Sequence, residues 1–323
     1  MARLVKALGR KAGLAREVRP HALRHEAITR ALDLCAGDDL VLKAEQFKPL
    51  RDKLLRGAAD FYGKLEGLLK GQPDRASRGA MGNAYFELGE LTAKIGDKPA
   101  ALAAHRNGLA VRRELASDPA NDAKAREDVA KSLTAAAELL SETGESAEAL
   151  ARFEEARELL EGLPLSGPGS DGRRALLGRL ERSMGIVLKS TGKTAAALSA
   201  YQRSVETLTR LADDNPAVTE FRSRLADSHN TLGVLQKETG KPGEALDSYR
   251  RAPAIYQKLV DDNPALTEFR KGLANNHSDV GLLLGQLGKP AESLDSFRRA
   301  LAIVSPHSAG PARMGQVALC EKC

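Results

Sequence analysis

Apolar residues recur along most of the chain at the spacing of amphipathic helices, and one pattern returns every 48 positions. Five loop glycines mark this period, namely Gly96, Gly144, Gly192, Gly240 and Gly288. The fifth residue after each glycine is alanine or serine, and the sixth is leucine. The ninth is histidine, phenylalanine or tyrosine, and the twelfth is glycine, alanine or serine. These four offsets share one face of an α-helix. A fixed period of this size predicts a solenoid.

A second helix precedes each glycine, and its contact residue seven positions earlier is always small: Gly89, Ala137, Gly185, Gly233 or Gly281. Small residues let two helix backbones approach closely, so the unit is predicted to be an antiparallel helix pair. The expected pairs are 75–95 with 98–117, 121–143 with 146–161, 170–191 with 194–213, 217–239 with 242–261, and 265–287 with 290–304. Asn215-Pro216 and Asn263-Pro264 are interpreted as N-cap and first-turn proline of the helices that follow. Pro253 falls inside a predicted helix, where we favour sequence drift over a functional kink.

The pattern L-G-x6-G-x4-A-L-x2-[YF]-x2-A, as it stands at residues 232–252, resembles the tetratricopeptide (TPR) repeat. The usual unit has about 34 residues, and the longer unit here is similar to repeats that accompany bacterial protein kinases. The resemblance implies an all-α, right-handed solenoid of five antiparallel helix pairs with an N-terminal capping helix. It also implies an interaction platform whose partner is set by surface residues.

The sequence divides into four expected parts. A basic N-terminal segment covers 1–40, a capping helix 41–73, the five TPR repeats 74–304 and a disordered tail 305–323. The stretch LPLSGPG at 163–169 is the loosest joint of the array.

Charge is distributed unevenly between these parts. Residues 1–30 hold eight Lys or Arg and two acidic residues, which leaves 41 basic and 41 acidic residues in the remainder. The repeats are therefore neutral, and weak non-specific nucleic-acid binding is expected only of residues 1–30. No run reaches the 18 apolar residues of a membrane span. Cys35, Cys320 and Cys323 are too few for a disulfide framework, which favours a cytoplasmic protein.

Residues 6–38 do not fit the repeat. Their V-R-P-H-x-L-R-H box, followed by A-I-T-x-A-L-D, resembles part of the catalytic domain of tyrosine recombinases (phage-type integrases). The resemblance implies that His21 and Arg24 are the pair that binds the scissile phosphate. No tyrosine follows at the family's distance, since Tyr62 lies 41 residues after His21. We therefore interpret the segment as a recombinase-like remnant and predict no enzyme activity.

The TPR resemblance also assigns a site. In TPR arrays the first helix of each pair lines a concave groove that binds the ligand. By the repeat spacing, the resemblance implies that the ligand-facing residues here are Asn83, Lys131, Arg179, Arg182, Lys189, Asn230 and Lys237. The middle of this groove is basic and amide-rich, which favours an extended peptide with acidic side chains or a free carboxylate. A merely polar surface fits the same residues equally well.

Other chemistry finds little support in the sequence. His229 and His277 share one repeat position, where a packing role is favoured over a shared metal. Neither a nucleotide-binding glycine motif nor a nucleophile elbow is present, so no catalytic residue, cofactor or metal site is predicted. The sequence thus predicts a non-catalytic protein-interaction scaffold. Two alternatives stay open: a DNA-binding or DNA-recombination protein derived from a recombinase, and a detached regulatory TPR segment of a kinase-type signalling protein.

Overall fold

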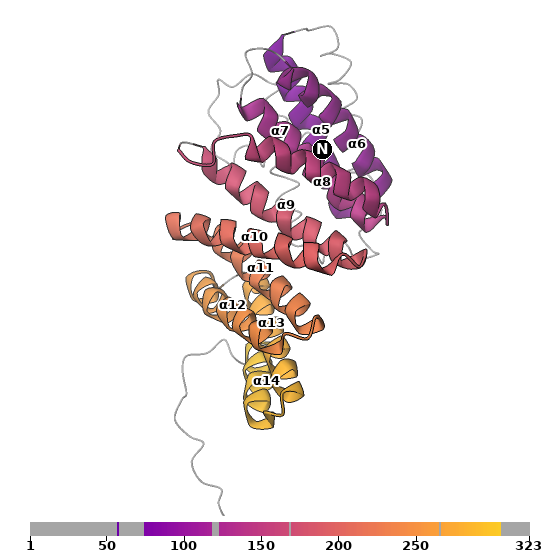
Figure 1. Cartoon of the computed structure of the whole chain (residues 1–323). Helices are drawn as coiled ribbons and strands as arrows, with labels where there is room; N and C mark the ends of the chain where they lie inside the picture. The colour runs from indigo at the N-terminus through magenta and orange to yellow at the C-terminus, as the bar shows by residue number, and fades with distance from the viewer. Residues whose placement is uncertain (1–56, 58–73, 118–122, 168, 265, 305–323) are drawn as a thin grey trace, which may run out of the picture. The chain divides into compact units, whose positions relative to one another are not determined.

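The computed structural model describes residues 57, 74–117, 123–167, 169–264 and 266–304 (Figure 1). Within these ranges the chain is all-α and contains no strand. Its helices are α5 (Arg75–Ile95), α6 (Lys98–Ala116), α7 (Ala123–Glu142), α8 (Ser146–Glu161), α9 (Ser170–Ser190), α10 (Thr194–Asp214), α11 (Thr219–Glu238), α12 (Pro242–Asp262), α13 (Thr267–Gln286) and α14 (Pro290–Val304). The predicted capping helix and tail, and the remnant with His21 and Arg24, lie outside the described residues.

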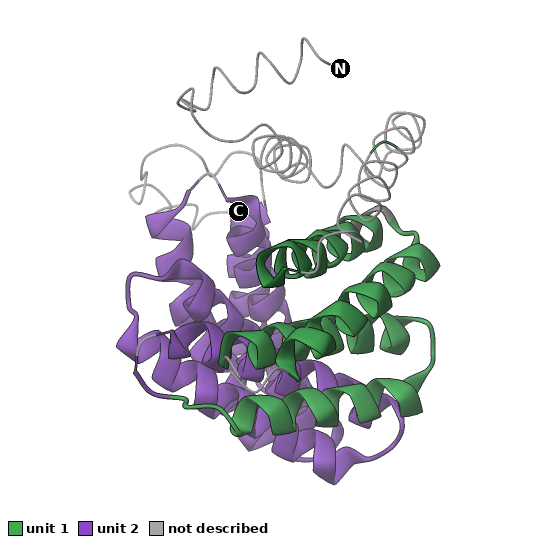
Figure 2. Ribbon diagram, turned by 90° about the horizontal axis from the view of Figure 1, so that it is seen from above, with its two compact units in different colours: residues 1–165 green, residues 166–323 purple. Residues whose placement is uncertain are grey.

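The helices pack in consecutive pairs, α5 with α6 through α13 with α14, so the predicted all-α, TPR-like solenoid of helix pairs is confirmed. The chain divides into two compact units, residues 1–165 and 166–323 (Figure 2). In the first unit α6 packs on α7. In the second unit α10 packs on α11, and α12 packs on α13. The boundary lies inside the stretch 163–169, where the joint was expected to be loosest.

The glycine period has a conformational cause. The five loop glycines have φ angles of 96°, 90°, 77°, 75° and 71° in chain order. This left-handed region suits glycine because a Cβ is disfavoured there. After Gly192 the Lys193 N–H donates to the Leu188 carbonyl at 2.8 Å, which satisfies one of the last carbonyls of α9. Each first helix therefore ends with the same glycine-dependent cap.

In four of the described helix pairs, the glycine of the first helix faces the ring of the second helix. A Cβ added to Gly233 would lie 2.8 Å from the Tyr249 ring, and one added to Gly89 would lie 2.5 Å from the His105 ring. Tyr249 is 0% exposed, so its ring has no room to move away. The pairing of small residue and ring is thus what sets the close approach of the two helices.

The predicted helix starts at the Asn-Pro joints are wrong. Asn215 is the C-cap of α10, and its Nδ2 donates to the Leu211 carbonyl at 3.0 Å. Asn263 ends α12 in the same way, with Nδ2 donating to the Leu259 carbonyl at 3.2 Å. Each following helix begins four residues later. The reason is that an asparagine amide donates as well as accepts, and the last carbonyls of a helix lack donors.

Proline is tolerated inside one helix. α12 continues from Pro242 to Asp262 through Pro253, which lies half-buried in its interior.

The arginine pairs Arg250-Arg251 and Arg298-Arg299 are exposed on α12 and α14, as expected for solvated positions on second helices.

Candidate functional site

Five of the seven predicted groove residues lie on first helices of the second unit. Arg179, Arg182 and Lys189 share one face of α9, because their offsets of 3, 7 and 10 residues bring them to the same side of a helix. Asn230 and Lys237 hold the equivalent positions of α11. We define the α9/α11/α13 face as these five residues together with Ile186, Asp227, Val234, Glu238, Asn275, Ser278, Asp279 and Leu282. Asn83 and Lys131 belong to the first unit.

Polar contacts between successive first helices hold this face together. Lys189 Nζ lies 2.8 Å from a carboxylate oxygen of Glu238, which joins α9 to α11. The Asn276 side-chain amide donates to the Asn230 carbonyl oxygen, which joins α13 to α11. The three first helices therefore run side by side within the unit, with equivalent repeat positions adjacent.

Arg182 is a cation of this face that no carboxylate of the described residues pairs with. It is half-buried and forms no hydrogen bond or ion pair with any other described residue. Burial raises the pKa of Tyr201 to about 12, and the Arg182 charge opposes this rise. Burial and the Asp227 carboxylate raise the pKa of Tyr256, and the Arg182 charge again opposes them. The guanidinium thus lies near both tyrosines while its donors are not used by a carboxylate of the described chain.

The face is less basic than the sequence suggested. Lys189 is paired with Glu238, and Lys237 acts electrostatically on Asp279. Burial raises the pKa of the Asp279 carboxyl, and the charge of Lys237 partly offsets this. Acidic residues on neighbouring first helices therefore offset part of the positive charge, and the excess is concentrated on α9.

The sequence prediction missed an apolar row on this face. Ile186, Val234 and Leu282 occupy one repeat position on α9, α11 and α13, six residues before the loop glycine. Ile186 is 42% exposed and Leu282 is 52% exposed, whereas Val234 is half-buried. In the first unit the same position holds Glu90 and Glu138. Comparing this offset across the five repeats would have revealed the row.

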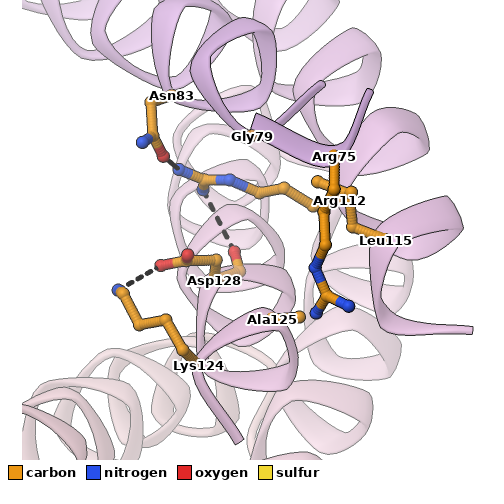
Figure 3. A pocket seen from close by; sticks show the side chains of 8 residues that line it. All are labelled: Arg75, Gly79, Asn83, Arg112, Leu115, Lys124, Ala125 and Asp128. Carbon is orange, nitrogen blue, oxygen red and sulfur yellow. Dashed lines mark hydrogen bonds and ion pairs between the residues drawn. The ribbon is translucent and has the colours of Figure 1, made fainter. Parts of the chain in front are cut away.

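The first unit has an open pocket of about 130 Å³ between α5, α6 and α7 (Figure 3). It is lined by Arg75, Gly79, Asn83, Arg112, Leu115, Lys124, Ala125 and Asp128. Arg112 is 5% exposed, and its guanidinium crosses from α6 toward Asn83 and Asp128. Burial lowers the pKa of Arg112, opposed by the charges of Asp128 and Glu87.

Within the part of the chain that the structure describes, this guanidinium donates its hydrogen bonds to neutral acceptors. Arg112 Nη2 donates to Asn83 Oδ1 at 2.9 Å, and Nη1 donates to the Asp128 carbonyl at 3.0 Å and to Ser132 Oγ at 2.7 Å. The Phe86 ring centroid lies 4.7 Å from the guanidinium carbon, within cation–π range. Arg112 therefore joins three helices. Asn83 is occupied by this bond, and Lys131 by an ion pair to Glu127 at 2.8 Å.

The two repeat-equivalent histidines differ in burial. His229 is 5% exposed, its Nδ1 has no hydrogen-bond partner, and burial lowers its pKa to about 4, assisted by the Arg251 charge. His277 is half-buried, and burial and the Arg299 charge lower its pKa as well. His229 therefore packs as a neutral ring in the core of the second unit.

Two further findings concern the described residues alone. They contain no group of three or more His, Cys, Asp or Glu placed to hold a metal ion. None of the helices from α5 to α14 is long and apolar enough to cross a membrane.

Solved structures share this fold. No protein-family model and no curated protein matches the sequence. BtubC (BKLC) from P. vanneervenii is 19% identical, covers 84% of this chain and 99% of its own, and has a TM-score of 0.63. The apo form of RapI is 14% identical, with coverages of 82% and 97% and a TM-score of 0.51. YrrB, described as a TPR protein with an unusual peptide-binding site, is 20% identical, with coverages of 69% and 87% and a TM-score of 0.39, too low to support an argument. The likenesses to BtubC and RapI show the fold, an all-α, TPR-like helical solenoid.

Proposed function

We propose that the chain is a non-catalytic protein-interaction scaffold that binds an extended peptide on the α9/α11/α13 face. The observation that carries the proposal is Arg182, a half-buried cation without a carboxylate partner among the described residues. Burying a charge is costly unless it is paired, so such a residue is suited to a carboxylate supplied from outside. Exposed apolar side chains on the same face provide area that a partner can bury.

The chemistry of the face suits recognition better than catalysis. Its pairings, such as Lys189 with Glu238, fix the positions of side chains without placing a base beside a nucleophile. The partner we expect is therefore a protein or peptide with acidic groups, bound in the cytoplasm. The recombinase-like remnant with His21 and Arg24 has no part in this proposal.

A selection experiment tests the proposal. A displayed library of random dodecapeptides is selected on the immobilised full chain, and enrichment is compared between wild type, Arg182→Glu and Lys258→Glu. Lys258 is exposed on α12, so the control makes the same kind of charge change on a second helix. We expect acidic peptides to be enriched by wild type and by Lys258→Glu but lost with Arg182→Glu. Equal enrichment by all three proteins, or none by wild type, would refute the proposal.

A further inference from the structure

The apolar row on the α9/α11/α13 face has a spacing that a ligand must match. Ile186, Val234 and Leu282 lie one on each first helix at the same register. The position tolerates charge, because Glu90 and Glu138 occupy it in the first unit. Its apolar character is confined to the three consecutive repeats of the second unit. Ile186 and Leu282 expose apolar surface at the two ends of the row, whereas the half-buried Val234 between them also packs against the core of α12 and α13.

α11 contacts both α9 and α13. Packed helices lie about 8–10 Å apart, so we expect successive side chains of the row to repeat at about this distance. A polyproline-II peptide has three residues per turn and rises about 3.1 Å per residue, so every third side chain returns to the same side after about 9.3 Å. In a β-strand, side chains on one side repeat at about 6.6 Å, which does not match. Spanning three helices takes seven residues of the polyproline-II form.

Charge changes sign along the same row. On α9 the row is flanked by Arg182 and Lys189, four residues before and three after Ile186. On α13 the corresponding positions hold Ser278 and Gly285, and Asp279 lies beside Leu282. Asp279 forms no ion pair with the described residues, and Lys237 of α11 is the cation that acts on it. The α9 end thus favours an anion and the α13 end a cation.

We propose that the α9/α11/α13 face binds a polyproline-II peptide of the form Φ-x-x-Φ-x-x-Φ, where Φ is aliphatic, with a carboxylate at the end over α9 and a cation at the end over α13. The inference rests on the proposed function and specifies its ligand. The ligand is extended, because the α9 end of the face favours an anion and the α13 end favours a cation, and a single peptide that crosses all three helices can supply both charges.

Defined peptides test the spacing and the charges by fluorescence anisotropy with the full chain. The probe is labelled Asp-Leu-Pro-Pro-Leu-Pro-Pro-Leu-Lys, and the comparison peptide has the same composition with leucine at every second position. We expect the probe to bind at least about tenfold more tightly, since misplacing aliphatic side chains forfeits their burial. Versions with aspartate at both ends or lysine at both ends should bind several-fold more weakly than the probe. Equal affinities across these peptides would overturn the inference.

Matched variants locate the binding. Ile186→Glu and Leu282→Glu introduce the residue that two other repeats carry at this position, so folding is expected to be preserved. Each should weaken probe binding at least about fivefold, because a charge replaces apolar area that the bound peptide would bury. The control Leu294→Glu changes a 50% exposed leucine on α14 and should leave binding unchanged. Equal losses in all three variants would overturn the assignment to this face.

The outcome separates this inference from the proposed function. If library peptides depend on Arg182 but the probe and comparison peptides bind alike, the function stands and the ligand form is wrong. If a helical peptide with leucine every seventh residue binds more tightly than the probe, the ligand form is also wrong, because the row would then match a helix. If no peptide depends on Arg182 or on the apolar row, both proposals fail.

Discussion

Acidification should destabilise the second unit through His229. The residue is 5% exposed, and burial lowers its pKa from 6.5 to about 4. The folded state therefore binds fewer protons than the unfolded state across this interval. Its contribution to stability is fully present above pH 6.5 and is lost as the pH falls toward 4.

The magnitude follows from the two pKa values. At pH 5 the unfolded histidine is almost fully protonated and the folded one is mostly neutral, which costs about 2 kcal/mol relative to pH 7.5. Against typical stabilities of about 5–15 kcal/mol this is a large fraction. His277 contributes with the same sign because its pKa is also lowered. A variant at His229 alone is therefore needed to isolate its share.

The assay is urea unfolding of the full chain, followed by circular dichroism at 222 nm from pH 7.5 to 5, for wild type and His229→Phe. Phenylalanine replaces the buried imidazole with a ring that cannot bind a proton. Between pH 7.5 and pH 5, the free energy of unfolding of wild type should fall by about 2 kcal/mol more than that of the variant. A difference that stays constant with pH, at constant denaturant slope, would refute the reasoning.

Three further predictions concern packing and the N-terminal segment. Gly233→Leu should lower the melting temperature by several degrees, because even a Cβ would lie 2.8 Å from the buried Tyr249 ring; an unchanged value would show that the ring relocates. Pro253→Leu should raise the melting temperature, since an interior proline costs about 3 kcal/mol and removes a backbone donor; a lower value would show that α12 needs the proline. The full chain should neither cleave nor covalently trap duplex DNA, and any binding through residues 1–30 should weaken as salt is raised. A salt-resistant adduct that disappears in Tyr62→Phe would contradict this.

The helix pairs were predictable because their determinants are local. A glycine at positive φ ends each first helix, and a small residue of that helix meets a ring that lies 16 positions later in the second helix, as Gly233 meets Tyr249. Helix starts at the Asn-Pro joints were not predictable from residue type. The amide of Asn215 has both a donor and an acceptor, and the structure uses the donor to end α10.

The electrostatics of the candidate site were only partly predictable. α9 is a continuous helix from Ser170 to Ser190, so offsets of 3, 7 and 10 residues bring Arg179, Arg182 and Lys189 to one side of it. Pairing depends on the neighbouring helix, and the Lys189 partner Glu238 is 49 residues away in the sequence. The basic excess expected from single helices is therefore smaller in the assembled face. The apolar row can be found in the sequence by comparing the position six residues before each loop glycine, but the exposure of Ile186 and Leu282 is a property of the packed structure.

The most direct test of the account is a double-mutant cycle between Arg182 and the acidic residue of a peptide selected on the full chain. Calorimetry measures four affinities: wild type and Arg182→Glu, each with the selected peptide and with its acid changed to lysine. The account predicts a favourable coupling of at least about 1 kcal/mol, with the lysine peptide recovering affinity for Arg182→Glu. A coupling of zero, with Arg182→Glu weakening both peptides equally or neither, would contradict binding at this face.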